Sequence, residues 1–280
     1  CEVGSATPVA DLQNCISNAA AGDTITFADD VQDFTISAEF TIDKSLIIDG
    51  AVGSSRIEID AQENSRVFSS TEDLALRNIK LTGGKSTYVD GIDTSAYGGA
   101  VRTSKNLELD NVAISDSYAS YRGGAASASE ITVRGDSEFS YNSANYGGAL
   151  HAATVMRVYA GALFNQNRAI TTEDKNPSFP EAGGGAIAAT EVSIYGTQDS
   201  PVVFTENYSF TYGGAIDALS SYDDTYIVDA EFQNNVAANG QGGAIYTSGE
   251  ATIRRTDFSF NYTEYSSGSA VFVTNGDLTL

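Results

Sequence analysis

The amino-acid sequence predicts an all-β fold, a coil of parallel strands with three short strands in each turn and roughly ten turns. Three observations lead to this prediction. A Gly-Gly-Ala-aliphatic tetrad recurs along the chain, a Phe-x-x-Asn motif lies between successive tetrads, and a third apolar run of strand type completes each unit. One such unit cannot bury its apolar face alone, so each unit must stack on its neighbours.

The tetrads and the Phe-x-x-Asn motifs alternate along the chain. Complete tetrads begin at Gly98, Gly123, Gly147, Gly184, Gly213 and Gly242, and a degraded copy begins at Gly268. The motifs between them are Phe139/Asn142, Phe164/Asn167, Phe204/Asn207, Phe232/Asn235 and Phe258/Asn261. This regular alternation indicates a repeat, whereas one four-residue match would carry no information.

Alignment of the repeats assigns a direction to each column of residues. The residue after Gly-Gly-Ala is aliphatic in most copies and is predicted to face the core, whereas the next residue varies and is predicted to point outward to solvent. The outward column comprises Arg102, Ser127, His151, Ala188, Asp217, Tyr246 and Phe272. The glycines are expected at corners that require a positive φ or close packing between turns.

The Asn of each Phe-x-x-Asn motif is predicted to form a ladder, in which side-chain amides bond from turn to turn. The ladder residues are Asn142, Asn167, Asn207, Asn235 and Asn261. Asn207 and Asn261 also begin Asn-x-Ser/Thr sequons, which are acceptors for N-glycosylation. An amide buried in a ladder cannot carry a glycan, so the two predictions compete at these positions, and we favour the ladder.

A single domain is expected over the whole chain. Its parts are an N-terminal cap at 1–30, irregular turns at 31–97 and the repeat turns at 98–280, which together make one β-helix domain at 1–280. Residues 9–21 are the best helix candidate, with Asp11 as the N-cap. A helix there would cover strand edges at the open end of the coil. Residues 171–181 are expected to form a protruding loop.

The charge of the chain excludes several classes of partner. Its 37 acidic and 15 basic residues give a formal net charge of −22 at pH 7. Nucleic acids and anionic membranes are bound through Lys and Arg, so neither is expected as a partner. No apolar run is long enough to span a bilayer, so no transmembrane segment is expected. The first residue is Cys1 rather than Met, which indicates a processed product or a fragment.

Both cysteines, Cys1 and Cys15, lie near the N-terminus. We predict a disulfide between them, which implies an oxidising compartment. Two unpaired thiols and a lipidated Cys1 are the alternatives.

The residues offer no clear active site. Glycoside hydrolysis requires two carboxylates at a fixed separation, and the outward column holds only Asp217. His151 is the only histidine, which excludes a site built from several histidines, and it is interpreted as a surface residue. No catalytic residue, cofactor or metal site is predicted, with calcium near Asp90 and Asp93 or within 171–181 as a weaker alternative.

The alternation of Gly-Gly-Ala-aliphatic with Phe-x-x-Asn resembles the repeats of the chlamydial-type polymorphic membrane proteins. The resemblance extends from Gly98 to the C-terminus and implies a right-handed parallel β-helix of an autotransporter passenger that acts as a surface adhesin. Residues 12–27, LQNCISNAAAGDTITF, look like the N-terminal capping segment of many secreted β-helix proteins. Two repeats depart from the pattern, because Ala126 replaces the aliphatic residue and Ser269 replaces a glycine.

Together these observations predict a non-enzymatic extracellular or cell-surface protein, either an adhesin stalk or a subunit of a filament. The filament variant is suggested by the strand-like residues at the end of the chain, Leu278 and Leu280. The expected partners are other copies or adjoining surface-protein segments that stack end to end, together with a cell-surface receptor or glycan. The alternative is a polysaccharide-active β-helix enzyme, a lyase or glycoside hydrolase, or a carbohydrate-binding module that uses exposed Tyr.

Overall fold

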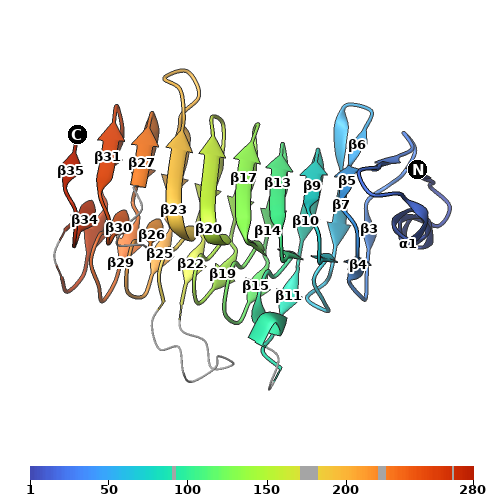
Figure 1. The fold of residues 1–280 in the computed structure, drawn as a ribbon, viewed down its shortest axis with the longest axis horizontal. Helices are drawn as coiled ribbons and strands as arrows, with labels where there is room; N and C mark the ends of the chain where they lie inside the picture. The colour runs from blue at the N-terminus through green and yellow to red at the C-terminus, as the bar shows by residue number, and fades with distance from the viewer. Residues whose placement is uncertain (90–92, 171–181, 220–224, 267) are drawn as a thin grey trace.

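The chain folds into a parallel β-helix that is capped at its N-terminal end by one α-helix (Figure 1). The computed structural model describes residues 1–89, 93–170, 182–219, 225–266 and 268–280. Within these ranges the paired strands are parallel, except for the hairpin of β6 (Ala51–Val52) with β7 (Ser55–Asp60). The predicted loop at 171–181 lies outside the described residues. A short 3₁₀ helix spans Asp93–Ala96.

The strands of the described residues form three sheets, which run along the length of the coil. The largest sheet contains β1 (Glu2–Val3), β2 (Thr24–Phe27), β4 (Phe40–Ile42), β5 (Leu46–Asp49), β8 (Phe68–Ser70), β9 (Leu74–Arg77), β12 (Val101–Thr103), β13 (Asn106–Asp110), β16 (Ala126–Ala128), β17 (Glu130–Arg134), β20 (Leu150–Tyr159), β23 (Ile187–Tyr195), β26 (Ile216–Ala218), β27 (Thr225–Val228), β30 (Ile245–Thr247), β31 (Ala251–Arg254), β34 (Val271–Val273) and β35 (Leu278–Thr279). The residue after each Gly-Gly-Ala begins a strand of this sheet.

The second sheet carries the Phe of the Phe-x-x-Asn motifs, and the third begins just after the Asn. The second contains β3 (Phe34–Thr35), β6, β7, β10 (Ile79–Thr82), β14 (Ala113–Ser115), β18 (Glu138–Ser140), β21 (Leu163–Asn165), β24 (Val202–Thr205), β28 (Ala230–Gln233) and β32 (Asp257–Ser259). The third contains β11 (Lys85–Ser86), β15 (Tyr118–Ala119), β19 (Ser143–Ala144), β22 (Arg168–Ala169), β25 (Tyr208–Ser209), β29 (Val236–Ala237) and β33 (Tyr262–Thr263).

The core consists of columns of identical or similar side chains, as the alignment of the repeats predicts. Leu150, Ile187, Ile216 and Ile245 pair in register from turn to turn and are fully buried. The Phe column stacks inside the second sheet, with ring centroids 4.7 Å apart between Phe204 and Phe232. Apolar burial on this scale is the main favourable term that holds successive turns together.

The two glycines of each tetrad serve different purposes, which the pair Gly213 and Gly214 illustrates. Gly213 has a φ of 55°, in the left-handed region that favours glycine. Gly214 has no such φ, but a Cβ there would overlap the carbonyl oxygen of Gly243 in the next turn. The first glycine therefore makes the corner, and the second lets neighbouring corners approach each other.

The cap helix differs from the predicted one at both ends. Helix α1 spans Pro8–Asn18, with Thr7 rather than Asp11 at the N-cap position. Pro8 sets this start, because proline fits the first turn of a helix, where its missing N–H is not needed. Asp11 instead accepts hydrogen bonds from the Thr7 hydroxyl and the Gly4 amide, at 3.0 and 3.3 Å, and so holds the chain that enters the helix.

Candidate functional site

The ladder asparagines meet in one buried column, and Asn207 shows how each is satisfied. Its Nδ2 donates to the carbonyl oxygen of Phe164 and to Oδ1 of Asn235, both at 3.0 Å. Its own Oδ1 accepts from the amide nitrogen and from Nδ2 of Asn167, at 3.0 and 3.1 Å. The amide thus bonds to both neighbouring turns, which lets a polar group lie in the core without loss of its hydrogen bonds.

The turn residue before each ladder asparagine explains why the amide points inward. Tyr141, Gln166, Glu206, Asn234 and Phe260 all adopt a left-handed backbone, with φ between 54° and 57°. This conformation costs a non-glycine residue about 1–2 kcal/mol, which the ladder hydrogen bonds offset. Sequence reasoning missed these residues, because their side chains vary and none of them is a glycine.

The ladder continues one turn beyond the motifs, to Ser117. The Ser117 amide donates to Oδ1 of Asn142 at 3.1 Å, and its hydroxyl accepts from the Gly84 amide at 3.1 Å. Ser117 was not found from the sequence, because Ile114 replaces the Phe three residues before it. The position of Ile114 opposite Phe139 in the strand register is the signal that identifies this turn.

Both sequon asparagines belong to the ladder. Asn207 is fully buried, and Asn261 is 9% exposed, with its Nδ2 donating to the Phe232 carbonyl oxygen at 2.8 Å. A glycan would replace a hydrogen on the amide nitrogen that makes these bonds. Glycosylation of either asparagine therefore requires the ladder to break at that turn.

The interpretation of the outward column as a solvent-facing surface is wrong for its middle part. Ser127, His151, Ala188 and Asp217 are at most 4% exposed. The residues that precede the tetrads form a row of their own along the coil, which comprises Tyr97, Arg122, Tyr146, Gly183 and Tyr212. Their side chains lie beside the outward column, as the contact of Tyr212 with the Tyr246 ring at 4.6 Å shows. The residues that precede the tetrads thus cover the middle part of the outward column, although this column lies outside the coil interior.

His151 is consequently a buried residue and not a surface one. Burial, and secondarily the positive charge of Arg122, lowers the pKa of His151 to about 3. Its Nδ1 lies 3.4 Å from the Ser127 hydroxyl. At neutral pH the ring is therefore uncharged.

The column does not assemble a catalytic triad from Ser127, His151 and Asp217. The strand register places Ala188 between His151 and Asp217, so the two are two turns apart. At the usual strand spacing this separation is roughly 9–10 Å, too far for a carboxylate to orient the imidazole. Among the described residues no group of three or more His, Cys, Asp and Glu is arranged to hold a metal ion. Asp90 and residues 171–181, considered for calcium, lie outside the described residues.

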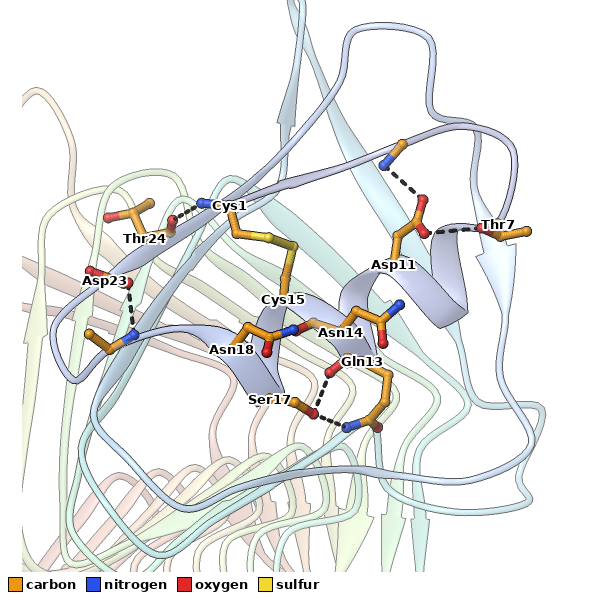
Figure 2. The surroundings of a disulfide bond; sticks show 12 residues. Cys1, Thr7, Asp11, Gln13, Asn14, Cys15, Ser17, Asn18, Asp23 and Thr24 are labelled. Carbon is orange, nitrogen blue, oxygen red and sulfur yellow. Dashed lines mark hydrogen bonds between the residues drawn. A yellow bond between two sulfur atoms is a disulfide. The ribbon is translucent and has the colours of Figure 1, made fainter.

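Cys1 and Cys15 are joined by a disulfide, with their Cα atoms 5.6 Å apart (Figure 2). The bond ties the strand β1 to the middle of helix α1. The Cys1 ammonium also donates to the Thr24 carbonyl oxygen at 3.3 Å. The first residue of the chain is thus part of the cap.

The comparisons with known proteins agree with the repeat. The family model described as the Chlamydia polymorphic membrane protein repeat matches residues 229–248, which contain Phe232, Asn235 and the tetrad that begins at Gly242. The matched stretch is thus similar to a repeat of this family.

The chain also matches part of one curated protein, a probable autotransporter. The chain is 38% identical over 91 residues to the "Probable autotransporter YfaL" of Escherichia coli (strain K12). The match covers 31% of this chain and 7% of the relative, so the chain spans only a small part of the relative's length. No solved structure gives a significant match. In the described part of the chain, no helix is both long and apolar enough to cross a membrane.

Proposed function

We propose that this polymorphic-membrane-protein-type chain is a non-enzymatic adhesive scaffold, a stalk that displays variable side chains on a constant coil. The observation that carries the proposal is the contrast between its interior and exterior. Inside, the Phe and Asn columns repeat the same side chain from turn to turn. Outside, neighbouring turns carry unrelated residues, such as Glu108, Thr132 and Arg157, which pair in register in the largest sheet. A repeat of this kind keeps its fold while its surface changes.

An extracellular or cell-surface location belongs to the same proposal. The two matches are named as a polymorphic membrane protein repeat and a probable autotransporter. The disulfide between Cys1 and Cys15 is compatible with secretion, because disulfides persist in oxidising compartments.

End-to-end stacking is the mode of assembly that the last turn supports. Leu278 pairs with Ala251, which is 1% exposed, yet Leu278 is 42% exposed, and Leu280 is 82% exposed. A further turn of the same repeat would cover these side chains and pair with β34. Such a turn comes from adjoining surface-protein sequence in a stalk, or from another copy in a filament.

The adhesive role is tested by immobilising the purified chain through its N-terminal cap on beads and measuring retention of cells under flow. Specific retention that soluble chain competes away is the expected result. The matched control is a bead coated with chain that was unfolded in urea and reduced, which keeps the composition and the charge. Equal retention on both beads would contradict adhesion by the folded surface.

The non-enzymatic part of the proposal is tested separately. The chain is incubated with a panel of neutral and acidic polysaccharides, and newly formed reducing ends and unsaturated uronates are measured. No release above that of a heat-treated sample is expected. Turnover on any member of the panel would favour the lyase or glycoside hydrolase alternative.

A further inference from the structure

A pocket of about 210 Å³ lies on the outside of the coil, across three successive turns. Its wall contains Arg102 from the first turn, Arg122 and Ser127 from the second, and His151 from the third. The Tyr97 ring lies beside them. None of the residues that line the pocket is acidic.

The two arginines of the pocket lie in a strongly acidic chain, which has 37 acidic and 15 basic residues. Some arginines are ion-paired, and Arg66, Arg157 and Arg255 each lie within 3.2 Å of a carboxylate. Arg102 and Arg122 form no ion pair with any described carboxylate. Two positive charges at one pocket thus have no negative partner among the described residues.

The Arg122 side chain is held in place but is not fully satisfied. Its guanidinium lies over the rings of Tyr97 and Tyr121, at 5.2 and 4.7 Å from their centroids, and one amine donates to the Tyr121 hydroxyl at 3.3 Å. Its Nε is buried and makes no hydrogen bond within the described residues. A buried donor without an acceptor is costly, and a ligand at the pocket would supply one.

The other polar side chains of the pocket would also bind a ligand that accepts hydrogen bonds. Ser127 and His151 are each 4% exposed, and the pair provides a hydroxyl and an imidazole that donate or accept hydrogen bonds. Distant acidic residues do not prevent anion binding, because exposed charges beyond about 8 Å are largely screened at physiological ionic strength.

We propose that this pocket binds a small oxyanion, a carboxylate or sulfate group, through the guanidinium groups of Arg102 and Arg122. Planar guanidinium groups match carboxylate and sulfate-like oxyanions with two parallel hydrogen bonds. The volume lies below the roughly 300–1,000 Å³ of pockets that enclose drug-sized ligands, so a single charged group or one acidic sugar residue enters it. This binding goes beyond the adhesive role and does not depend on it.

His151 provides the test, because the only histidine of the chain lies in the pocket. The ring resonances of His151 are followed by NMR at pH 6.5, while sodium sulfate, sodium glucuronate or neutral glucose is added at constant ionic strength. Sulfate and glucuronate are expected to shift the resonances with saturation, and glucose is expected to leave them unchanged. Sulfate is also expected to raise the pKa of His151, because an anion favours the charged ring.

Two substitutions distinguish a built site from general screening. Arg122→Gln is expected to weaken binding at least tenfold, whereas Arg134→Gln removes the same charge outside the pocket and is expected to leave binding unchanged. Arg134 is a suitable control because it too lies over a tyrosine ring, that of Tyr159, at 4.3 Å. Circular dichroism and thermal unfolding confirm that both variants fold, and Arg102→Gln replaces Arg122→Gln if the latter does not.

The outcomes of these experiments distinguish which kind of anion the pocket binds. Saturable binding of both anions assigns a general oxyanion site, and binding of glucuronate alone assigns a carboxylate-sugar site. Shifts that are linear in anion concentration, or equal in the Arg122→Gln and Arg134→Gln variants, would overturn the proposal. Because this experiment uses no cells, its failure is distinct from a failure of adhesion.

Discussion

At the scale of single residues, Asn207 shows how much the buried hydrogen bonds of the ladder contribute to stability. Its amide makes four hydrogen bonds, to Phe164, Asn167 and Asn235. Asn207→Ala leaves several buried groups without partners, at about 1–3 kcal/mol each, so we expect a loss of roughly 3 kcal/mol in the free energy of unfolding. Urea denaturation followed by circular dichroism measures this loss.

The control for Asn207→Ala is Asn165→Ala, which also truncates an asparagine but in strand β21, where the side chain is outside the ladder. It is expected to change the free energy of unfolding by less than about 0.5 kcal/mol. Equal denaturation midpoints for the two variants would show that the ladder contributes little.

His151 makes the stability of the protein depend on pH. Its pKa in the folded chain is about 3, below the ordinary value near 6.5, so protons bind preferentially to the unfolded chain. The contribution of the neutral ring is therefore complete above about pH 6.5 and is lost as the pH falls toward 3. Between pH 7 and pH 4 the loss from this residue amounts to about 3 kcal/mol.

The measurement compares the free energy of unfolding of the native chain and of a His151→Gln variant at pH 7 and at pH 4. Protonation of carboxylates affects both proteins alike, so the difference between them isolates the imidazole. The native chain is expected to lose more stability than the variant over this interval. Parallel losses in the two proteins would mean that His151 titrates normally in the folded state.

At the scale of the elements, the first glycine of the tetrad corner has both a positive φ and closely packed surroundings. A comparison of Gly213 with Gly53 separates the effects of these two features on stability. Gly213 and Gly53 have almost the same φ, 55° and 57°, but a Cβ meets the Ile216 carbonyl oxygen at Gly213 and nothing within 4 Å at Gly53. Gly53→Ala is expected to cost about 1–2 kcal/mol for the backbone alone. Gly213→Ala is expected to cost at least about 3 kcal/mol.

Thermal unfolding of the two glycine variants measures the difference. A larger shift for Gly213→Ala identifies close packing within the tetrad corner as a further reason for the recurrent glycine. If both variants lose the same stability, the positive φ alone explains the tetrad.

The elements also show which features can be predicted from one sequence. The aliphatic, Phe and Asn columns were predictable, because the same residue recurs at the same place in each unit and burial requires it. The burial of His151 was not, because it depends on Arg122 and other residues of a neighbouring row, whose types vary between turns. Ser117 was missed for a similar reason, since its turn keeps the geometry of the ladder but not its residues. The helix start was predictable from Pro8 and was misplaced because Asp11 is also a favourable N-cap residue.

At the scale of the whole molecule, the parallel strands pair only with strands of adjacent turns, and the two ends of the described coil differ. The N-terminal end is closed by helix α1, whose Leu12, Cys15 and Ile16 are buried (Figure 1). The C-terminal end presents core columns that are partly exposed, as Phe258 and Val271 show. Exposed strand edges of this kind recruit further strands unless they are covered.

Residues 1–280, purified by themselves, are therefore expected to self-associate through the turn that contains β35. Leu278→Ser combined with Leu280→Ser removes the most exposed apolar side chains of that turn, and we expect it to reduce concentration-dependent association in sedimentation velocity at least several-fold. The control is Tyr141→Ser, which removes a side chain that is 56% exposed on the flank of an inner turn. Association that persists in the double variant but disappears with Tyr141→Ser would place the contact on the flank and argue against end-to-end stacking. A filament also requires that the contact repeat in one direction, since a head-to-tail contact builds an open chain while a symmetric one stops at a dimer.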